Sequence, residues 1–196
     1  MKSILYSFII LILLSGCASF SDRIVKDHKQ ELIQNDLKKL EGHYDLFPDS
    51  SYDRKGKLQT IEPEDSKSGH NLNYFVKSPE AKYSYDKGYT IEIKVVGPDR
   101  LKFITKKENV AIDSVELSGK LKNGLFYLDN TYLKRNGIPY IAGGYTNYKT
   151  RIGLTKDNGL LVNYAYDNSG ALLFLFWAGS DYNLAYHYRR FETIHQ

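Results

Sequence analysis

The sequence predicts a mainly β protein: an antiparallel up-and-down meander that closes into a barrel of about nine or ten strands, behind one N-terminal α-helix. Three observations predict this class. The chain has 17 tyrosines and 9 phenylalanines against one methionine and one tryptophan, which favours strands over helices. Short apolar runs follow one another from residue 72 to residue 191. Turn signals separate these runs, and no helical pattern interrupts them.

Residues 19–41 are expected to form the helix, ending at Gly42. Six apolar residues fall largely on one face at a period of 3.6: Ile24, Val25, Leu32, Ile33, Leu37 and Leu40. The segment either packs across the folded domain or spaces it from a membrane. The apolar stripe favours packing, since a bare spacer needs none.

Strands are expected from residue 42 onward. The first covers 42–47 and ends at Pro48, and a long polar loop follows at 48–70, with room for a short strand at 58–61. The apolar runs after it lie at 72–76, 89–96, 101–105, 110–117, 125–133, 151–154, 160–166, 171–177 and 182–191. Turns are predicted at 97–99, 122–124, 135–137, 157–159, 168–170 and 179–181, where Gly and Asn supply positive φ. Gly143-Gly144 is interpreted as a bulge or tight bend.

Strands joined by tight turns are antiparallel neighbours, and closing a long meander removes its exposed edges. The run from Leu172 to Trp177 is apolar on both faces. One face should point into the barrel, and the 19–41 helix is the expected cover for the other.

Aromatic residues share strand faces near the C-terminus. The candidate ligand-binding residues are Tyr164, Tyr166, Phe174, Phe176, Trp177, Tyr186 and Tyr188. If these strands line one interior, their rings could wall a pocket for a small hydrophobic or amphipathic molecule. The same rings could instead fill the core. The sequence leaves both alternatives open.

The N-terminus carries an export signal. Basic Lys2 precedes an apolar run at 4–14, which is too short to cross a bilayer as a helix. Leu14-Ser15-Gly16-Cys17 then resembles the lipobox of bacterial lipoproteins. The resemblance implies cleavage after residue 16, acyl chains such as palmitate on Cys17, and a lipid anchor in a bacterial membrane. Ala18 and Ser19 follow without an aspartate, which implies the outer membrane if the host is Gram-negative.

Three segments follow from this interpretation: the signal at 1–16, the lipidated N-terminus and helix at 17–41, and the barrel domain at 42–196. Cys17 is the only cysteine, so a lipidated chain has no thiol for a disulfide, a nucleophile or a metal. The formal charge of +4 comes without a basic block, so no nucleic-acid partner is predicted. No catalytic constellation and no cofactor motif is recognised, and we expect a protein that is not an enzyme.

The five histidines are His28, His43, His70, His187 and His195. None has a metal-ligand spacing, so no metal site is predicted. His43 and His187 could meet if the first and last strands pair, as a polar contact or as the one metal site worth testing.

Gly42-His43-Tyr44 stands where the lipocalin-like (calycin) group usually has Gly-x-Trp, and the meander resembles that group's barrel. The resemblance implies that Arg189 or Arg190 packs across the Tyr44 ring and closes the barrel base. Two functions are carried forward. The first is a lipid-anchored module that binds a small hydrophobic or amphipathic ligand. The second is an envelope assembly protein that binds a protein partner through its outer surface or its 48–70 loop.

Overall fold

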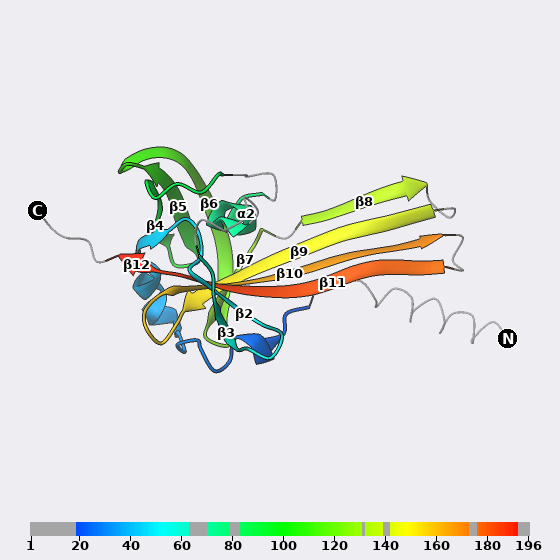
Figure 1. Ribbon diagram of the computed structural model, residues 1–196, viewed down its shortest axis with the longest axis horizontal. Coiled ribbons are helices and arrows are strands. Elements are labelled where there is room, and N and C mark those ends of the chain that lie inside the picture. Colours follow the sequence, from blue (N-terminus) through cyan, green and yellow to red (C-terminus); the bar gives the residue numbers. More distant parts are fainter. Residues whose placement is uncertain are drawn as a thin grey trace, which may run out of the picture.

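The computed structural model describes residues 19–62, 70–78, 83–130, 132–138, 142–172 and 176–191, without the side chains of 131–145 and 169–178. Twelve strands form one antiparallel sheet that curls into a half-barrel (Figure 1). The predicted mainly β class and antiparallel meander are therefore confirmed. The strands are β1 (Gly42–Asp45), β2 (Ser50–Tyr52), β3 (Leu58–Thr60), β4 (Tyr89–Gly97), β5 (Arg100–Lys107), β6 (Val110–Lys122), β7 (Leu125–Leu128), β8 (Tyr132–Ile138), β9 (Ala142–Leu154), β10 (Leu160–Leu172), β11 (Phe176–Tyr188) and β12 (Arg190–Phe191).

The strand order brings the two ends of the chain together. It runs β12-β1-β4-β5-β6-β7-β9-β10-β11-β2-β3, with β8 on β9. β12 follows β11 after Arg189 alone. β11 and β12 therefore form one nearly continuous edge. On one side β11 pairs with β10, and on the other side β2 pairs with β11 and β1 pairs with β12. The two ends of the curled sheet thus meet at the short β1–β12 pairing, and the short β2, β3 and β12 add to the expected number of strands.

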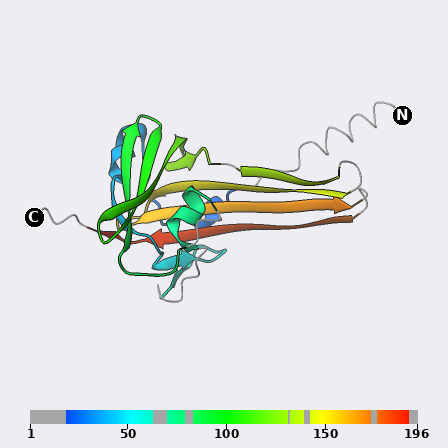
Figure 2. The ribbon, with the colours of Figure 1, turned by 90° about the horizontal axis from the view of Figure 1, so that it is seen from above.

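Three long strands carry part of the sheet away from the barrel. β9, β10 and β11 have 13 residues each and pair over that length, and β8 joins them on β9. Figures 1 and 2 show these four strands running out from the compact part as an arm. The turns predicted at 135–137, 168–170 and 179–181 are wrong, because those residues pair inside β8, β10 and β11. The bulge predicted at Gly143-Gly144 is wrong too, since both residues pair in register with β10.

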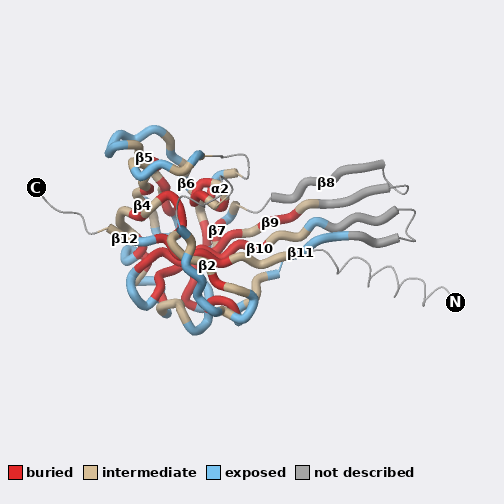
Figure 3. Tube along the Cα trace, viewed as in Figure 1, coloured by how far each residue is buried: buried red, intermediate tan, exposed pale blue. Residues whose placement is uncertain are grey.

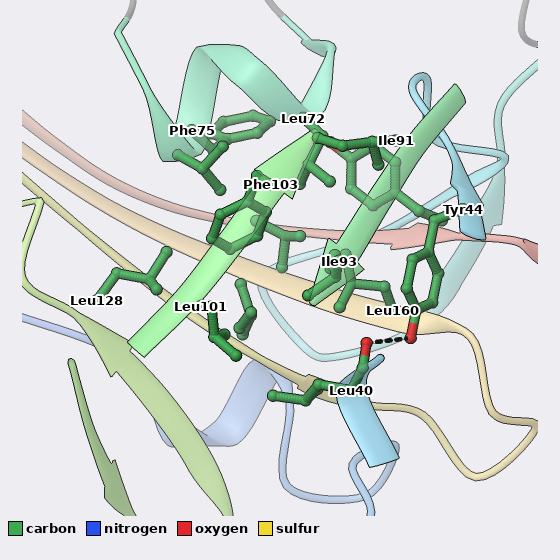
Figure 4. Close-up of a cluster of buried hydrophobic side chains, with 14 of the residues drawn as sticks. Leu40, Tyr44, Leu72, Phe75, Ile91, Ile93, Leu101, Phe103, Leu128 and Leu160 are labelled. Atoms are coloured by element: carbon green, nitrogen blue, oxygen red, sulfur yellow. Dashed lines mark hydrogen bonds between the residues drawn. The ribbon is translucent and has the colours of Figure 1, made fainter. Parts of the chain in front are cut away.

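The main core lies inside the barrel, where Figure 3 shows most of the buried chain. In Figure 4, Leu72 and Phe75 of α2 (Leu72–Val76) lie against β4 and β5 residues such as Ile91 and Phe103. The sequence predicts a strand at 72–76, and this is wrong. A run of five residues is too short to show a period, and the Asn71 side chain, which accepts from the backbone N–H of Tyr74 at 3.0 Å, caps a helix.

Residues 19–41 do not form one α-helix. They contain two 3-10 helices, η1 (Asp22–Ile24) and η2 (Gln34–Leu40), joined by chain that bridges to Thr155 and Gly124. Ile24 packs in a cluster on the outer face of the sheet, whereas Leu40 packs in the inner core. One straight helix could not pack against both faces of the sheet. Ile24 and Val25 still cover part of the outer face, in a cluster with Tyr52, Leu125, Leu161 and Ala185. The run at 172–177, for which this cover was predicted, lies outside the described side chains.

The turn at Asn123-Gly124 is confirmed, with φ of 51° and 74°. The predicted 48–70 loop holds the β2–β3 hairpin, and its residues 63–69 lie outside the described chain. The signal at 1–16 and Cys17 also lie outside it. In the described residues, no helix has the length and apolar character needed to span a membrane.

Candidate functional site

Tyr164 in β10 lies at the centre of a ring cluster inside the barrel. Its side chain is fully buried, and the ring centroids of Phe75, Tyr148 and Tyr166 lie 5.1, 5.7 and 6.5 Å away. Its hydroxyl has no hydrogen-bond partner among the described residues. Burial raises the pKa of this hydroxyl far above its usual value. Rings of the protein itself therefore fill the interior around Tyr164.

The structure brings four of the seven predicted ring residues onto the inner face of β10 and β11: Tyr164, Tyr166, Tyr186 and Tyr188. Tyr166 is stacked on Tyr182 at 4.6 Å, and the Tyr188 hydroxyl donates to the backbone oxygen of His70 at 2.8 Å. The other three predicted residues lie outside the described side chains: Phe174, Phe176 and Trp177. The described part of this set packs as core.

Tyr44 and Arg190 meet at the base of the barrel. The Arg190 guanidinium lies over the Tyr44 ring, 5.6 Å from its centroid, and donates to the backbone oxygens of Lys39, at 3.1 Å, and Glu41. A Cβ on Gly42 would stand 2.8 Å from the Arg190 Nε. The Gly-x-aromatic pattern thus has a physical reason here, because only glycine leaves room for this arginine beside the ring.

Arg189 does not share this contact. Its Nε lies 3.1 Å from a carboxylate oxygen of Asp45, and its guanidinium lies over Phe191 at 5.4 Å. Burial raises the pKa of Asp45, and the neighbouring Arg189 opposes that shift. These residues line a hollow of about 280 Å³ beside the barrel base.

A larger hollow of about 960 Å³ opens where β12 meets β1; we call it the seam hollow. It lies between the end of η2, the strands β1, β4 and β12, and the turn before β10. Charged groups of both signs share the wall with apolar ones. The lining residues are Lys39, Glu41, Gly42, His43, Glu92, Ile93, Lys94, Leu154, Asp157, Asn158, Arg190 and Phe191.

Glu92 organises the charges on the β4 wall of the seam hollow. Its carboxylate lies 2.8 Å from the Lys106 ammonium, 3.1 Å from that of Lys94 and 3.9 Å from the His43 Nε2. Burial alone would raise the pKa of Glu92, but the two lysines outweigh it and lower that pKa. The carboxylate is therefore charged at neutral pH and holds these cations at the wall.

His187 in β11 contacts two carboxylates rather than His43. Its Nδ1 lies 2.5 Å from Asp49 and its Nε2 lies 3.4 Å from Asp157. Burial would lower the pKa of His187, but the hydrogen bond and charge of Asp49, with Asp157, raise it. Among the described residues, no group of three histidine, cysteine or acidic side chains is placed to hold a metal.

Arg151 is a functional candidate that the sequence did not reveal. Its side chain is 1% exposed on the outer face of β9, where its Nε donates to Asn163 at 2.7 Å and its Nη1 to Tyr127 and Asp22, both at 2.6 Å. In the sequence, Arg151 is one polar residue in a strand where polar and apolar residues alternate, which is typical of an exposed position. Its contact with Asp22 spans 129 residues, so no local pattern could have indicated it.

Comparison with protein-family models, with curated proteins and with solved structures finds no match for this chain.

Proposed function

We propose that this protein is a lipoprotein of the bacterial cell envelope, anchored through lipid on Cys17, whose half-barrel binds a small amphipathic molecule in the seam hollow. The lipobox-like residues before Cys17 support the anchor. The outer membrane is the proposed location in a Gram-negative host. The half-barrel is compatible with the lipocalin-like group of binding proteins.

The observation that carries the binding proposal is the seam hollow itself. At about 960 Å³ it has the size of a small-molecule site. Lys94 and Glu92 present charge at its wall, while Leu154 and Phe191 supply apolar surface. A molecule with a charged or polar group and an apolar part would satisfy both. The filled ring cluster around Tyr164 favours this hollow over the barrel interior.

The test begins with mass spectrometry of organic extracts from the protein purified out of its native membrane. We expect an acylated Cys17 peptide and a co-purified amphipathic molecule. Lys94→Ala removes a half-exposed wall cation and should lower the amount of that molecule severalfold. Lys102→Ala is the matched control, because Lys102 also pairs with a glutamate, Glu116, but lies outside the hollow.

An extract without any small molecule, or an equal amount from the Lys94→Ala and Lys102→Ala proteins, would contradict the binding proposal. An unmodified Cys17 peptide would contradict the anchor. The two parts of the proposal therefore fail separately.

A second function is supported by the arm formed by β8 to β11. Its four strands extend beyond the place where the barrel closes (Figure 1), and a sheet that projects in this way offers a surface for a protein partner. Mild cross-linking in the native membrane followed by purification should then recover one envelope protein in stoichiometric amount. Recovery of the lipoprotein alone would count against this alternative.

A further inference from the structure

The chain that follows Cys17 is fixed to the barrel from its first described residue; we call Ser19–Gln30 the N-terminal strap. The Asn183 side chain in β11 bonds it at two points. Its Nδ2 donates to the Ser19 backbone oxygen at 2.8 Å, and the Ser21 backbone N–H donates to its Oδ1 at 2.9 Å. One side-chain amide thus holds the strap backbone as a neighbouring strand would.

Arg151 adds a second attachment one residue further along. Its guanidinium stacks on the Phe20 ring at 4.4 Å and pairs with the Asp22 carboxylate at 2.6 Å. The Phe20 ring also meets the Tyr127 ring edge-on at 5.4 Å. Arg151 is almost fully buried, so its guanidinium is held in one place by the barrel, and it presents a fixed partner to the Phe20 ring and to the largely exposed Asp22 carboxylate.

The rest of the strap is attached as well. Ile24 and Val25 are buried in the outer cluster, the His28 Nε2 lies 2.6 Å from the Gly56 oxygen, and the Gln30 amide donates to the Thr155 oxygen at 2.8 Å. A flexible linker between an anchor and a domain would lack such contacts. The strap is therefore part of the folded domain.

We infer that the strap seats the flank of the sheet around Asn183 directly on the surface of a phospholipid membrane, in one fixed orientation. This inference rests on the proposed lipid at Cys17. Two residue steps separate Cys17 from Ser19, and fully extended chain covers at most about 7 Å over two residues. A domain fixed at Ser19 cannot move away from a bilayer that holds Cys17, so the base of the arm lies at the lipid surface.

The flank itself carries charges of both signs. Asp181 and Asp167 face each other across β11 and β10, and Lys149 lies on the neighbouring strand. The two carboxylates outnumber the one ammonium, so these charges give the flank no attraction to anionic lipids. The short tether and the strap, rather than attraction to headgroup charge, set the orientation, which should therefore be independent of ionic strength.

The experiment uses the full lipidated chain in vesicles of phosphatidylethanolamine and phosphatidylglycerol. Since lipid occupies Cys17, an introduced cysteine is the only free thiol and can carry one fluorophore. Asp181→Cys places it beside Asn183. Val110→Cys is the control, because Val110 is 64% exposed and begins β6, which the strand order separates from β11 by β7, β9 and β10. A quencher carried on lipid should quench the label at 181 severalfold more than the label at 110, at low and at high salt.

Loosening the strap should abolish this difference. Asn183→Ala combined with Asp22→Asn removes the amide that bonds Ser19 and Ser21 and the charge that pairs with Arg151, and should bring the two labels to similar quenching. Asp27→Asn makes the same charge change on an exposed residue of the strap and should leave the difference intact.

Equal quenching of the two labels in the lipidated parent would overturn the orientation. So would a difference that vanishes at high salt, or one that the Asn183→Ala/Asp22→Asn chain retains. The mass of the N-terminal peptide and a Cys17→Ser chain are measured in parallel. A parent chain that carries no lipid and stays in the aqueous phase overturns the proposed anchor, whereas a lipidated chain with equal quenching overturns the orientation alone.

Discussion

Replacement of Arg151 by methionine removes the buried positive charge that joins the N-terminal strap to β9 and keeps most of the side-chain volume. Arg151 makes hydrogen bonds to Asn163, Tyr127 and Asp22 and lies over the Phe20 ring. Methionine can still contact the rings. It cannot donate, so the Asn163 Oδ1 is left without this donor inside the protein.

The loss of stability depends on whether the former partners of Arg151 can bond to water once the arginine is gone. The Asp22 side chain is 66% exposed, so water solvates it and its loss of the ion pair costs little. The buried Asn163 cannot reach water, and an unsatisfied buried acceptor costs about 1–3 kcal/mol. The replacement also relieves the burial of a charge. We expect a net loss of about 1–3 kcal/mol, which lowers the melting temperature by roughly 3–9 °C in a domain of this size.

The measurement is thermal unfolding of the detergent-solubilised chain, followed by far-ultraviolet circular dichroism. Asp22→Asn should cost less than about 1 kcal/mol, and in the Arg151→Met background it should cost nothing further, because its partner is gone. The reasoning is refuted if Arg151→Met melts at the parent temperature, or if Asp22→Asn costs more than Arg151→Met does.

Three further predictions use the same assay. Tyr164→Phe removes a buried hydroxyl that has no partner among the described residues, so stability should stay level or rise by about 1 kcal/mol; a clear loss would show that this hydroxyl is bonded. Gly119→Ala should cost about 1–3 kcal/mol through overpacking, because the new Cβ would stand 2.4 Å from the Tyr127 backbone oxygen and 2.6 Å from the Phe126 ring. Gly97→Ala, whose Cβ would meet nothing nearer than 3.5 Å, should be far milder, and equal losses would contradict the packing argument. His187→Gln should be more destabilising at pH about 5.5 than at pH about 9: the raised pKa of His187 means that its charged form is favoured by folding, so its contribution is complete below the unfolded pKa and is lost as pH rises through the folded one. A loss that does not change with pH would exclude this ionic role.

The sequence predicted the sheet because its strands are defined by local pairs and local turns. Asn123-Gly124 adopts the positive φ angles that a tight turn needs, and β6 and β7 pair directly across it. The turn at Glu108 and Asn109 has positive φ at both residues as well, yet it was missed because it contains no glycine. At Asn168 and Gly170 the sequence predicted a turn that does not form, because both residues lie inside β10. Continuous pairing of β10 with β9 and β11 outweighs their turn preference.

The candidate sites could be predicted only where a motif is local. Gly42-His43-Tyr44 indicated the barrel base, and the structure places Arg190 over Tyr44. The partner of Arg151 lies 129 residues away, and its role depends on a strap whose sequence suggested a helix. Five of the six positions in the predicted apolar stripe are buried, whereas Ile33 is 62% exposed. The predicted single helix does not form, because Ile24 and Leu40 are buried on opposite faces of one sheet.

The burial of the N-terminal segment on both faces of the sheet connects the fold with the proposed anchor. A helix packed on one face would attach to the domain by a single apolar stripe. The strap packs Ile24 on the outer face, and the chain that continues from it packs Leu40 inside, so this segment passes around the edge of the sheet before it enters β1, which pairs with β12 at the seam. Withdrawal of the strap would uncover the outer cluster and pull on the seam that closes the barrel. If Cys17 is held by lipid, the anchor is therefore attached to the folded barrel itself. Arg151 and Asn183 are the residues that connect the anchored end of the strap to the sheet.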